Sequence, residues 1–196
     1  MTTATVTTSR WEELRERFGG VDTPAAIAGM FTAMGVFLFL AGLGAAGAGG
    51  LAFQVDTVDV EGAVEEITLV GGILALVGLF VAFLVGGWAA GRMARYDGGL
   101  NGAMTAFWMV LLIVIFAALG AWIGQEYNVF AQMNLPDWVA VWSGDEATAA
   151  AVIGGIVGIV VMFLGGYLGG RWGEAYHRKA DAALADAARN EPPPVV

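Results

Sequence analysis

The sequence contains no cysteine and only one histidine, and charged residues are scarce. Without cysteine the chain cannot form a disulfide, a thiolate metal site or a thiol nucleophile. The single histidine, His177, lacks the partners that a metal site or a catalytic triad requires. Charged residues make up 14% of the chain, whereas 58% is hydrophobic and the mean hydropathy is +0.70. A water-soluble fold of 196 residues could not bury so much apolar surface.

Four apolar stretches are long enough to cross the hydrocarbon core of a bilayer, which requires about 20 helical residues. They cover residues 24–51, 67–91, 100–124 and 147–170, and their interiors lack Asp, Glu, Lys, Arg and His. In lipid, only helices and closed barrels satisfy all backbone hydrogen bonds, and continuous apolar runs without alternation indicate helices. The sequence therefore predicts an all-α fold, an integral membrane four-helix bundle.

The basic residues predict how this bundle is oriented. All nine lie before the first span, between the second and third, or after the fourth. By the positive-inside rule this side is cytoplasmic, so both termini are expected in the cytoplasm and the protein in the plasma membrane. The opposite loops carry acids in a number that matches the net charge of -9: Asp56, Asp59, Glu61, Glu65, Glu66, Glu126, Asp137, Asp145 and Glu146.

The segments outside the spans divide the chain further. Residues 1–22 predict a short cytoplasmic or interfacial helix, residues 23–171 the transmembrane domain, and residues 172–196 a cytoplasmic helical extension with a disordered tail. Asp22 or Thr23 is expected to cap the first span, with Pro24 at the first helical position. Residues 136–142 predict a short outer helix, which is either an aromatic interface anchor or a lid.

The four spans divide into two similar hairpins. The second span ends in GGWAAGR at residues 86–92 and the fourth in GGYLGGR at residues 165–171, while GMFTA at 29–33 matches GAMTA at 102–106. Each unit contains two helices, so the repeats have parallel topology. We predict two pseudo-repeated transmembrane hairpins.

Small residues recur every three or four positions along the second and fourth spans. Such stripes let helix backbones approach closely in lipid, where no hydrophobic force drives helices together. These two spans are therefore expected to form the tight centre of the bundle. The residues predicted to pack there are Gly71, Gly78, Gly86, Gly87, Gly91, Gly154, Gly158, Gly165 and Gly169.

The GG, GxxTA, ALGA and GG[WY]xxGR motifs extend across almost the whole membrane region. In these motifs the chain resembles the small, mostly uncharacterised multi-helix membrane proteins of actinobacteria, akin to the YrzE-like group. The resemblance implies a helical bundle in the plasma membrane. It brings no activity, substrate or catalytic residue with it, and the long acidic and aromatic outer loops depart from the pattern.

The cytoplasmic basic residues have two interpretations. Arg92 and Arg171 occupy equivalent repeat positions, where a cation complements the helix dipole and reaches lipid phosphate. Alternatively, they form a headgroup or protein-partner site together with Arg95, Arg178 and Lys179. Asp97, in the turn at residues 96–99, is expected to make local hydrogen bonds.

No ionisable residue is predicted within the membrane, whereas ion-coupled transporters and intramembrane hydrolases usually carry one. We therefore expect no enzymatic activity, no cofactor and no metal site. The expected function is assembly, scaffolding or an accessory role in the envelope, through contacts with lipid and with further copies or other membrane proteins, and not with nucleic acid. The alternative is a small oligomeric channel or uncoupled permease with an acidic outer mouth.

Overall fold

The computed structural model describes residues 16–17, 19–54, 60–127 and 145–190. This part of the chain forms four long helices and no strand: α2 (Thr23–Gln54), α3 (Val60–Met93), α4 (Gly98–Tyr127) and α7 (Asp145–Asn190). All four contain a stretch long and apolar enough to cross a membrane. The predicted all-α membrane bundle of four helices is therefore confirmed.

The helices are longer than the predicted spans, most clearly at α3. This helix begins at Val60, so Glu61, Glu65 and Glu66 belong to its first turns and not to a loop as predicted. Acidic residues are favoured in the first turn of a helix because they interact well with its dipole. At the other end of the chain, α7 continues without a break to Asn190, as the predicted helical extension requires.

Some predictions fall outside the described residues. Of residues 1–22, the structure describes 16–17, which are helical, and 19–22, which are not. The predicted outer helix at residues 136–142 and the tail at residues 191–196 are not described.

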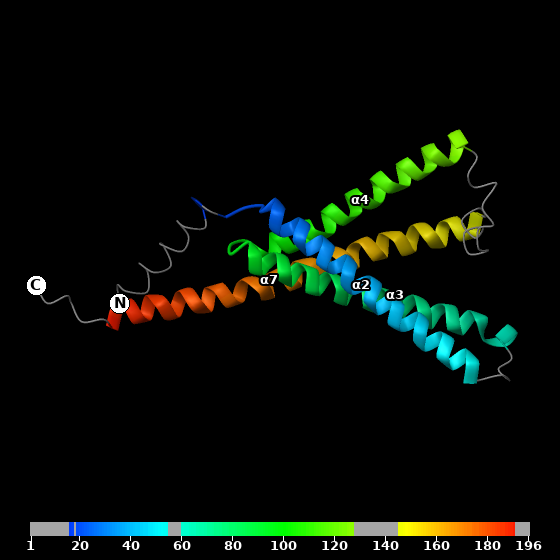
Figure 1. Ribbon diagram of the computed structural model, residues 1–196, viewed down its shortest axis with the longest axis horizontal. Helices are drawn as coiled ribbons and strands as arrows, with labels where there is room; N and C mark the ends of the chain where they lie inside the picture. The colour runs from blue at the N-terminus through cyan, green and yellow to red at the C-terminus, as the bar shows by residue number, and fades with distance from the viewer. Residues whose placement is uncertain (1–15, 18, 55–59, 128–144, 191–196) are drawn as a thin grey trace, which may run out of the picture.

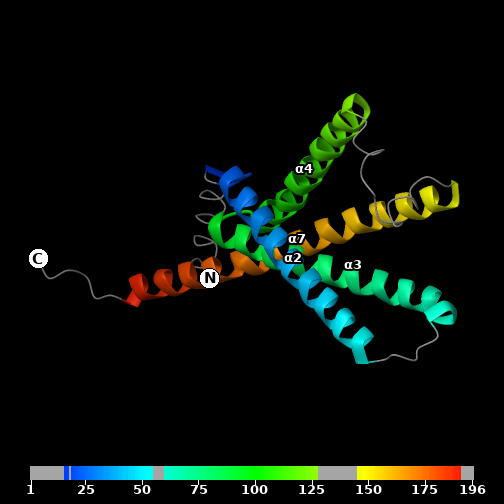
Figure 2. The same ribbon diagram turned by 45° about the vertical axis from the view of Figure 1, so that its right-hand side comes forward.

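The four helices meet at one end of the bundle and diverge toward the other (Figures 1 and 2). We call the first the turn end, since it contains the turn at residues 94–97, and the second the open end, where residues 54, 60, 127 and 145 lie. The most extensive interface joins α3 and α7, and α2 contacts α3 and α4 but not α7 within the described residues. The pairing of α3 with α7 at the centre of the bundle agrees with the sequence prediction.

The buried core lies near the turn end. Ala33, Phe83, Ala106 and Met162 contribute one side chain each from the four helices and form a cluster that is shielded from solvent. Toward the open end the large apolar side chains are exposed on every helix. The interior that holds the bundle together therefore occupies only part of its length.

Candidate functional site

Six glycines from three helices form the closest backbone contacts of the turn end, and we call them the glycine core. They occupy two layers. One layer contains Gly87 of α3, Gly102 of α4 and Gly166 of α7, and the next layer contains Gly91, Gly98 and Gly170 from the same helices. On each helix the two glycines are four residues apart, so they share one face.

The glycine core leaves no room for a side chain. A Cβ at Gly102 would overlap the carbonyl oxygen of Gly166, and a Cβ at Gly170 would overlap that of Gly98. Such overlap would occur with backbone atoms, which cannot rotate away as a flexible side chain can. Close approach of this kind is the use that small residues have in membrane helices.

A second row of glycines on α7 lies against the backbone of α3. Cβ atoms at Gly165, Gly169 and Gly173 would meet the carbonyl oxygens of Phe80, Leu84 and Trp88. Because each row repeats every four residues, α7 carries two adjacent glycine ridges. One faces α3 alone, and the other is shared with α4.

The structure places the predicted packing glycines in two groups. Backbone atoms of another helix surround the Cβ positions of Gly86, Gly87, Gly91, Gly165 and Gly169. Gly158 meets only the Leu79 side chain, at 3.7 Å from its Cβ position. A Cβ at Gly71, Gly78 or Gly154 would meet no described atom of another helix within 4 Å. Gly71 and Gly154 lie toward the open end, where the helices diverge, whereas Gly78 lies beside Leu79, which contacts α7, so Gly78 is on a face that no neighbouring helix covers. Those last three glycines therefore do not pack as expected.

Asn101, near the start of α4, is the polar centre of the turn end. Its side chain is 0% exposed, its Oδ1 accepts a hydrogen bond from the Asp22 N–H at 2.7 Å, and its Nδ2 donates to the Gly20 carbonyl at 2.9 Å. Nδ2 also lies 3.2 Å from the Asp97 carbonyl oxygen. Asn101 thus ties the segment before α2 to the start of α4.

Asp22 and Asp97 complete this connection. Asp22 Oδ1 accepts a hydrogen bond from the Ala25 N–H at 3.1 Å, so Asp22 is the N-cap of α2 and Pro24 is its second residue, one later than predicted. Asp97 Oδ2 accepts from the Gly20 N–H at 2.9 Å. The expected role of Asp97 was local, whereas this bond joins residues 77 positions apart.

The extension of α7 supplies further contacts to the turn between α3 and α4. Glu174 is 8% exposed, and its Oε2 accepts a hydrogen bond from the Gly98 N–H at 3.0 Å. One turn later, His177 Nε2 lies 2.8 Å from the carbonyl oxygen of Arg92. A carbonyl can only accept, so Nε2 carries the hydrogen in this bond. The helix α7 thereby supplies hydrogen-bond partners to two backbone groups near helix ends, the N–H of Gly98 and the carbonyl of Arg92.

The turn at residues 94–97 is held in an unusual backbone conformation. Arg95 and Asp97 have positive φ angles of 53° and 51°, in the left-handed region. Arg95 Nη2 lies 2.9 Å from Asp181 Oδ1 on the α7 extension. The side chains in this pair are 57% and 25% exposed, so water screens the attraction between them.

Most of the predicted cationic side chains contact other side chains of the protein. The Arg92 guanidinium lies 3.9 Å from the ring centroid of Tyr176, Arg171 lies 5.8 Å from that of Tyr167, and Arg178 lies 3.4 Å from Glu174. Lys179 is exposed. Arg95 pairs with Asp181, so four of the five cations contact side chains of α7.

Sequence reasoning missed several residues of the turn end. Asn101 is a polar residue at the start of the predicted span 100–124, where nothing in the sequence marks its partners, and nothing in the spacing connects Glu174 with Gly98. The pair Gly98–Gly102 has the GxxxG spacing of Gly87–Gly91 and Gly166–Gly170, and could have been found by it. In the described part of the chain, no group of three His, Asp or Glu side chains is arranged to hold a metal ion.

The chain was compared with known proteins in three ways, and no family model, curated protein or solved structure matches it.

Proposed function

We propose that this chain is a non-enzymatic assembly or accessory protein of the plasma membrane that acts through helix–helix contacts with other membrane proteins or further copies of itself. The observation that carries the proposal is the uncovered apolar surface of the open end. In α4, only 6% of the most apolar 18-residue window is buried. Val114, Phe116 and Trp122 of this helix are 57%, 65% and 63% exposed.

The polar side chains of the turn end support association over catalysis. Asn101, Glu174 and His177 form hydrogen bonds with backbone groups of neighbouring segments. Catalysis and ion coupling need groups that are free to exchange protons or change charge during the reaction. Here these three groups connect the helices, which suits a structural role.

A channel is supported less well. Ion conduction requires carbonyl or polar groups along the path. The cavity where the two hairpins separate is lined by apolar side chains and by glycines of continuous helices, whose carbonyls are used within the helix.

Site-specific photocrosslinking in native membranes tests the proposal. A photoreactive phenylalanine analogue at Phe116, an exposed site, should give a protein adduct of one defined mass, because a bound helix covers this face. The same analogue at Met162, which is 5% exposed in the core, should give none. Adducts with lipid alone at Phe116, and also at Val114 and Trp122, would contradict the proposal.

Flux measurements in liposomes test the alternative. The purified chain should leave vesicles impermeable to cations and small solutes. Reproducible cation flux that disappears when Glu65, Glu66 and Glu126 are neutralised would favour the channel and overturn the assembly role.

A further inference from the structure

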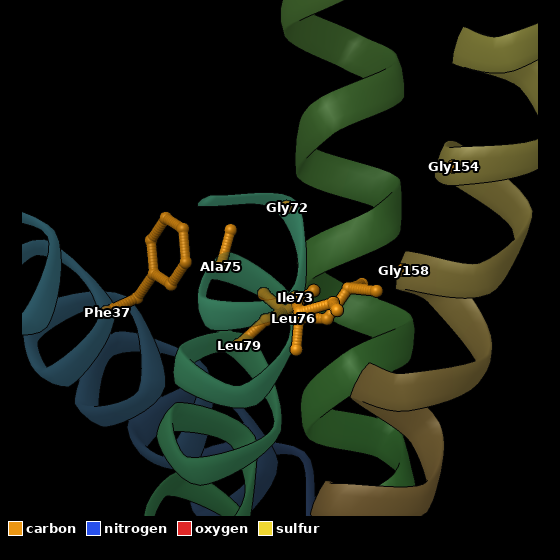
Figure 3. Close-up of a pocket in the computed structure, with 8 residues that line it drawn as sticks. All are labelled: Phe37, Gly72, Ile73, Ala75, Leu76, Leu79, Gly154 and Gly158. Carbon is orange, nitrogen blue, oxygen red and sulfur yellow. The ribbon is translucent and has the colours of Figure 1, made fainter. Parts of the chain in front are cut away.

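A groove begins where the interface between α3 and α7 ends. Leu79 of α3 lies 3.7 Å from the Cβ position of Gly158 on α7, and the two helices diverge toward the open end (Figures 1 and 3). The groove has a volume of about 450 Å³. It is lined by one residue of α2, five of α3 and two of α7: Phe37, Gly72, Ile73, Ala75, Leu76, Leu79, Gly154 and Gly158.

The lining determines the chemistry of an occupant. None of the eight lining residues has a side chain that can ionise or form a hydrogen bond. Side chains of α3 reach toward Gly158, and the lining residue Phe37 lies on α2, on the other side of α3 (Figure 3). The groove lies within the stretches Thr23–Gly47, Val70–Met93 and Val152–Leu184, which are long and apolar enough to cross a membrane. In a bilayer such stretches are surrounded by hydrocarbon. A polar occupant would lose its hydrogen bonds with water and find none here.

The volume of the groove bears on whether its occupant is a helix or a single hydrocarbon chain. One turn of helix, about 10 Å wide and 5.4 Å long, fills roughly 420 Å³. A volume of about 450 Å³ therefore holds little more than one turn, whereas a partner helix crosses the membrane over about 20 residues. A partner helix would therefore have most of its turns outside the groove, whereas a single hydrocarbon chain is thin enough to lie within it.

We propose that this groove binds the acyl chain of a membrane lipid, which lies between the two hairpins where α3 and α7 separate. The groove continues directly from the α3–α7 interface, so the chain would extend the packed centre of the bundle toward the open end. Glycines at 72, 154 and 158 give it flat walls, and Leu76 and Leu79 supply dispersion contacts. This inference does not depend on the proposed function.

Gly154→Leu tests the site by filling it. A Cβ at Gly154 meets no described atom within 4 Å, so the substitution should be compatible with the fold. Gly120→Leu is the matched control, since Gly120 also lies in a helix and faces open space but does not line the groove. Ala75→Phe, on the α3 wall, is a second filling variant. Helix content and elution volume report whether each variant is folded.

The readout is native mass spectrometry of protein extracted in mild detergent. We expect the unaltered chain and Gly120→Leu to retain one lipid under activation that removes loosely attached lipids. Gly154→Leu and Ala75→Phe should lose that lipid. Equal retention in all folded variants, retention of detergent alone, or a dimer in place of a lipid adduct would overturn the proposal.

A photoreactive acyl chain locates the occupant independently. A lipid with a diazirine in its tail should label peptides containing residues 72–79 and 154–158. This labelling should be lost in Gly154→Leu, while labelling around Leu43, an exposed residue that does not line the groove, remains. Labelling of the groove peptides that is unchanged in Gly154→Leu would show that the lipid only surrounds the protein.

Discussion

Glu174 of α7 accepts a hydrogen bond from the backbone N–H of Gly98, the first residue of α4, over 3.0 Å. The first N–H groups of a helix have no partner within it, and a negative charge beside them is favoured by the helix dipole. Glu174 is nearly buried, so the bond is protected from water. It links the end of the second hairpin to its beginning.

Removing this carboxylate should destabilise the turn end. A hydrogen bond to a charged group contributes about 1.5–3 kcal/mol, and Glu174→Ala leaves the Gly98 N–H without its partner. We expect a clear loss of thermal stability in detergent. Glu174→Gln should lose less, because the amide oxygen can still accept. Lys179→Ala, at an exposed site one turn further along, should change little, and equal effects from all three variants would show that the bond carries no stability.

The ion pair between Arg95 and Asp181 should contribute far less. Its side chains are 57% and 25% exposed, and exposed pairs are typically worth about 0–1 kcal/mol. Asp181→Ala should therefore lower thermal stability by less than Glu174→Ala, and most of that small loss should vanish in high salt. A double-mutant cycle with Arg95→Ala measures the pair directly. A coupling as large as the effect of Glu174→Ala would contradict this ranking.

The glycine core should not tolerate even one methyl group. A Cβ at Gly102 overlaps the Gly166 carbonyl, so Gly102→Ala must push α4 away from α7. Overpacking typically costs about 1–3 kcal/mol, and here the obstacle is backbone. Gly166→Ala should behave in the same way. Gly120→Ala and Gly154→Ala, which face open space, should retain the thermal stability of the unaltered chain or exceed it, because alanine favours helix.

The helices and their number could be predicted because long apolar runs in lipid have only one common solution. The central pairing of α3 with α7 followed from the small-residue stripes. The extent of that pairing did not follow, since the small-residue stripes continue through Gly71 and Gly154, beyond the height at which the helices diverge. A periodic pattern identifies the face of a helix that can pack, but not the angle at which its neighbour crosses.

The polar contacts of the turn end could not be predicted from the sequence, for a different reason. Asn101 and Gly20, or Glu174 and Gly98, are about 80 positions apart and connect a side chain to a backbone group. Backbone donors and acceptors exist at every position, so no spacing of residue types marks them. The duplication of the hairpins and the orientation in the membrane stay predictions.

Asn101 should be the most sensitive polar position in the bundle. Asn101→Ala removes the partners of the Asp22 N–H and the Gly20 carbonyl, and an unsatisfied buried group costs about 1–3 kcal/mol. We expect a large fall in thermal stability and faster hydrogen exchange at the start of α2. Thr105→Val is the comparison, because the Thr105 hydroxyl makes only longer contacts of 3.3 and 3.4 Å. A loss for Thr105→Val as large as that for Asn101→Ala would contradict this role.

The absence of cysteine makes the orientation directly measurable. Single cysteines can be introduced and labelled in intact cells with a maleimide that does not cross the membrane. Because all basic residues flank the predicted cytoplasmic ends, Glu61→Cys and Gly144→Cys should react from outside. Lys179→Cys, on the α7 extension, should react only after the membrane is permeabilised. Labelling of Lys179→Cys in intact cells, with Glu61→Cys protected, would reverse the topology, and labelling at only one of the two outer sites would mean that the number of membrane crossings is not four.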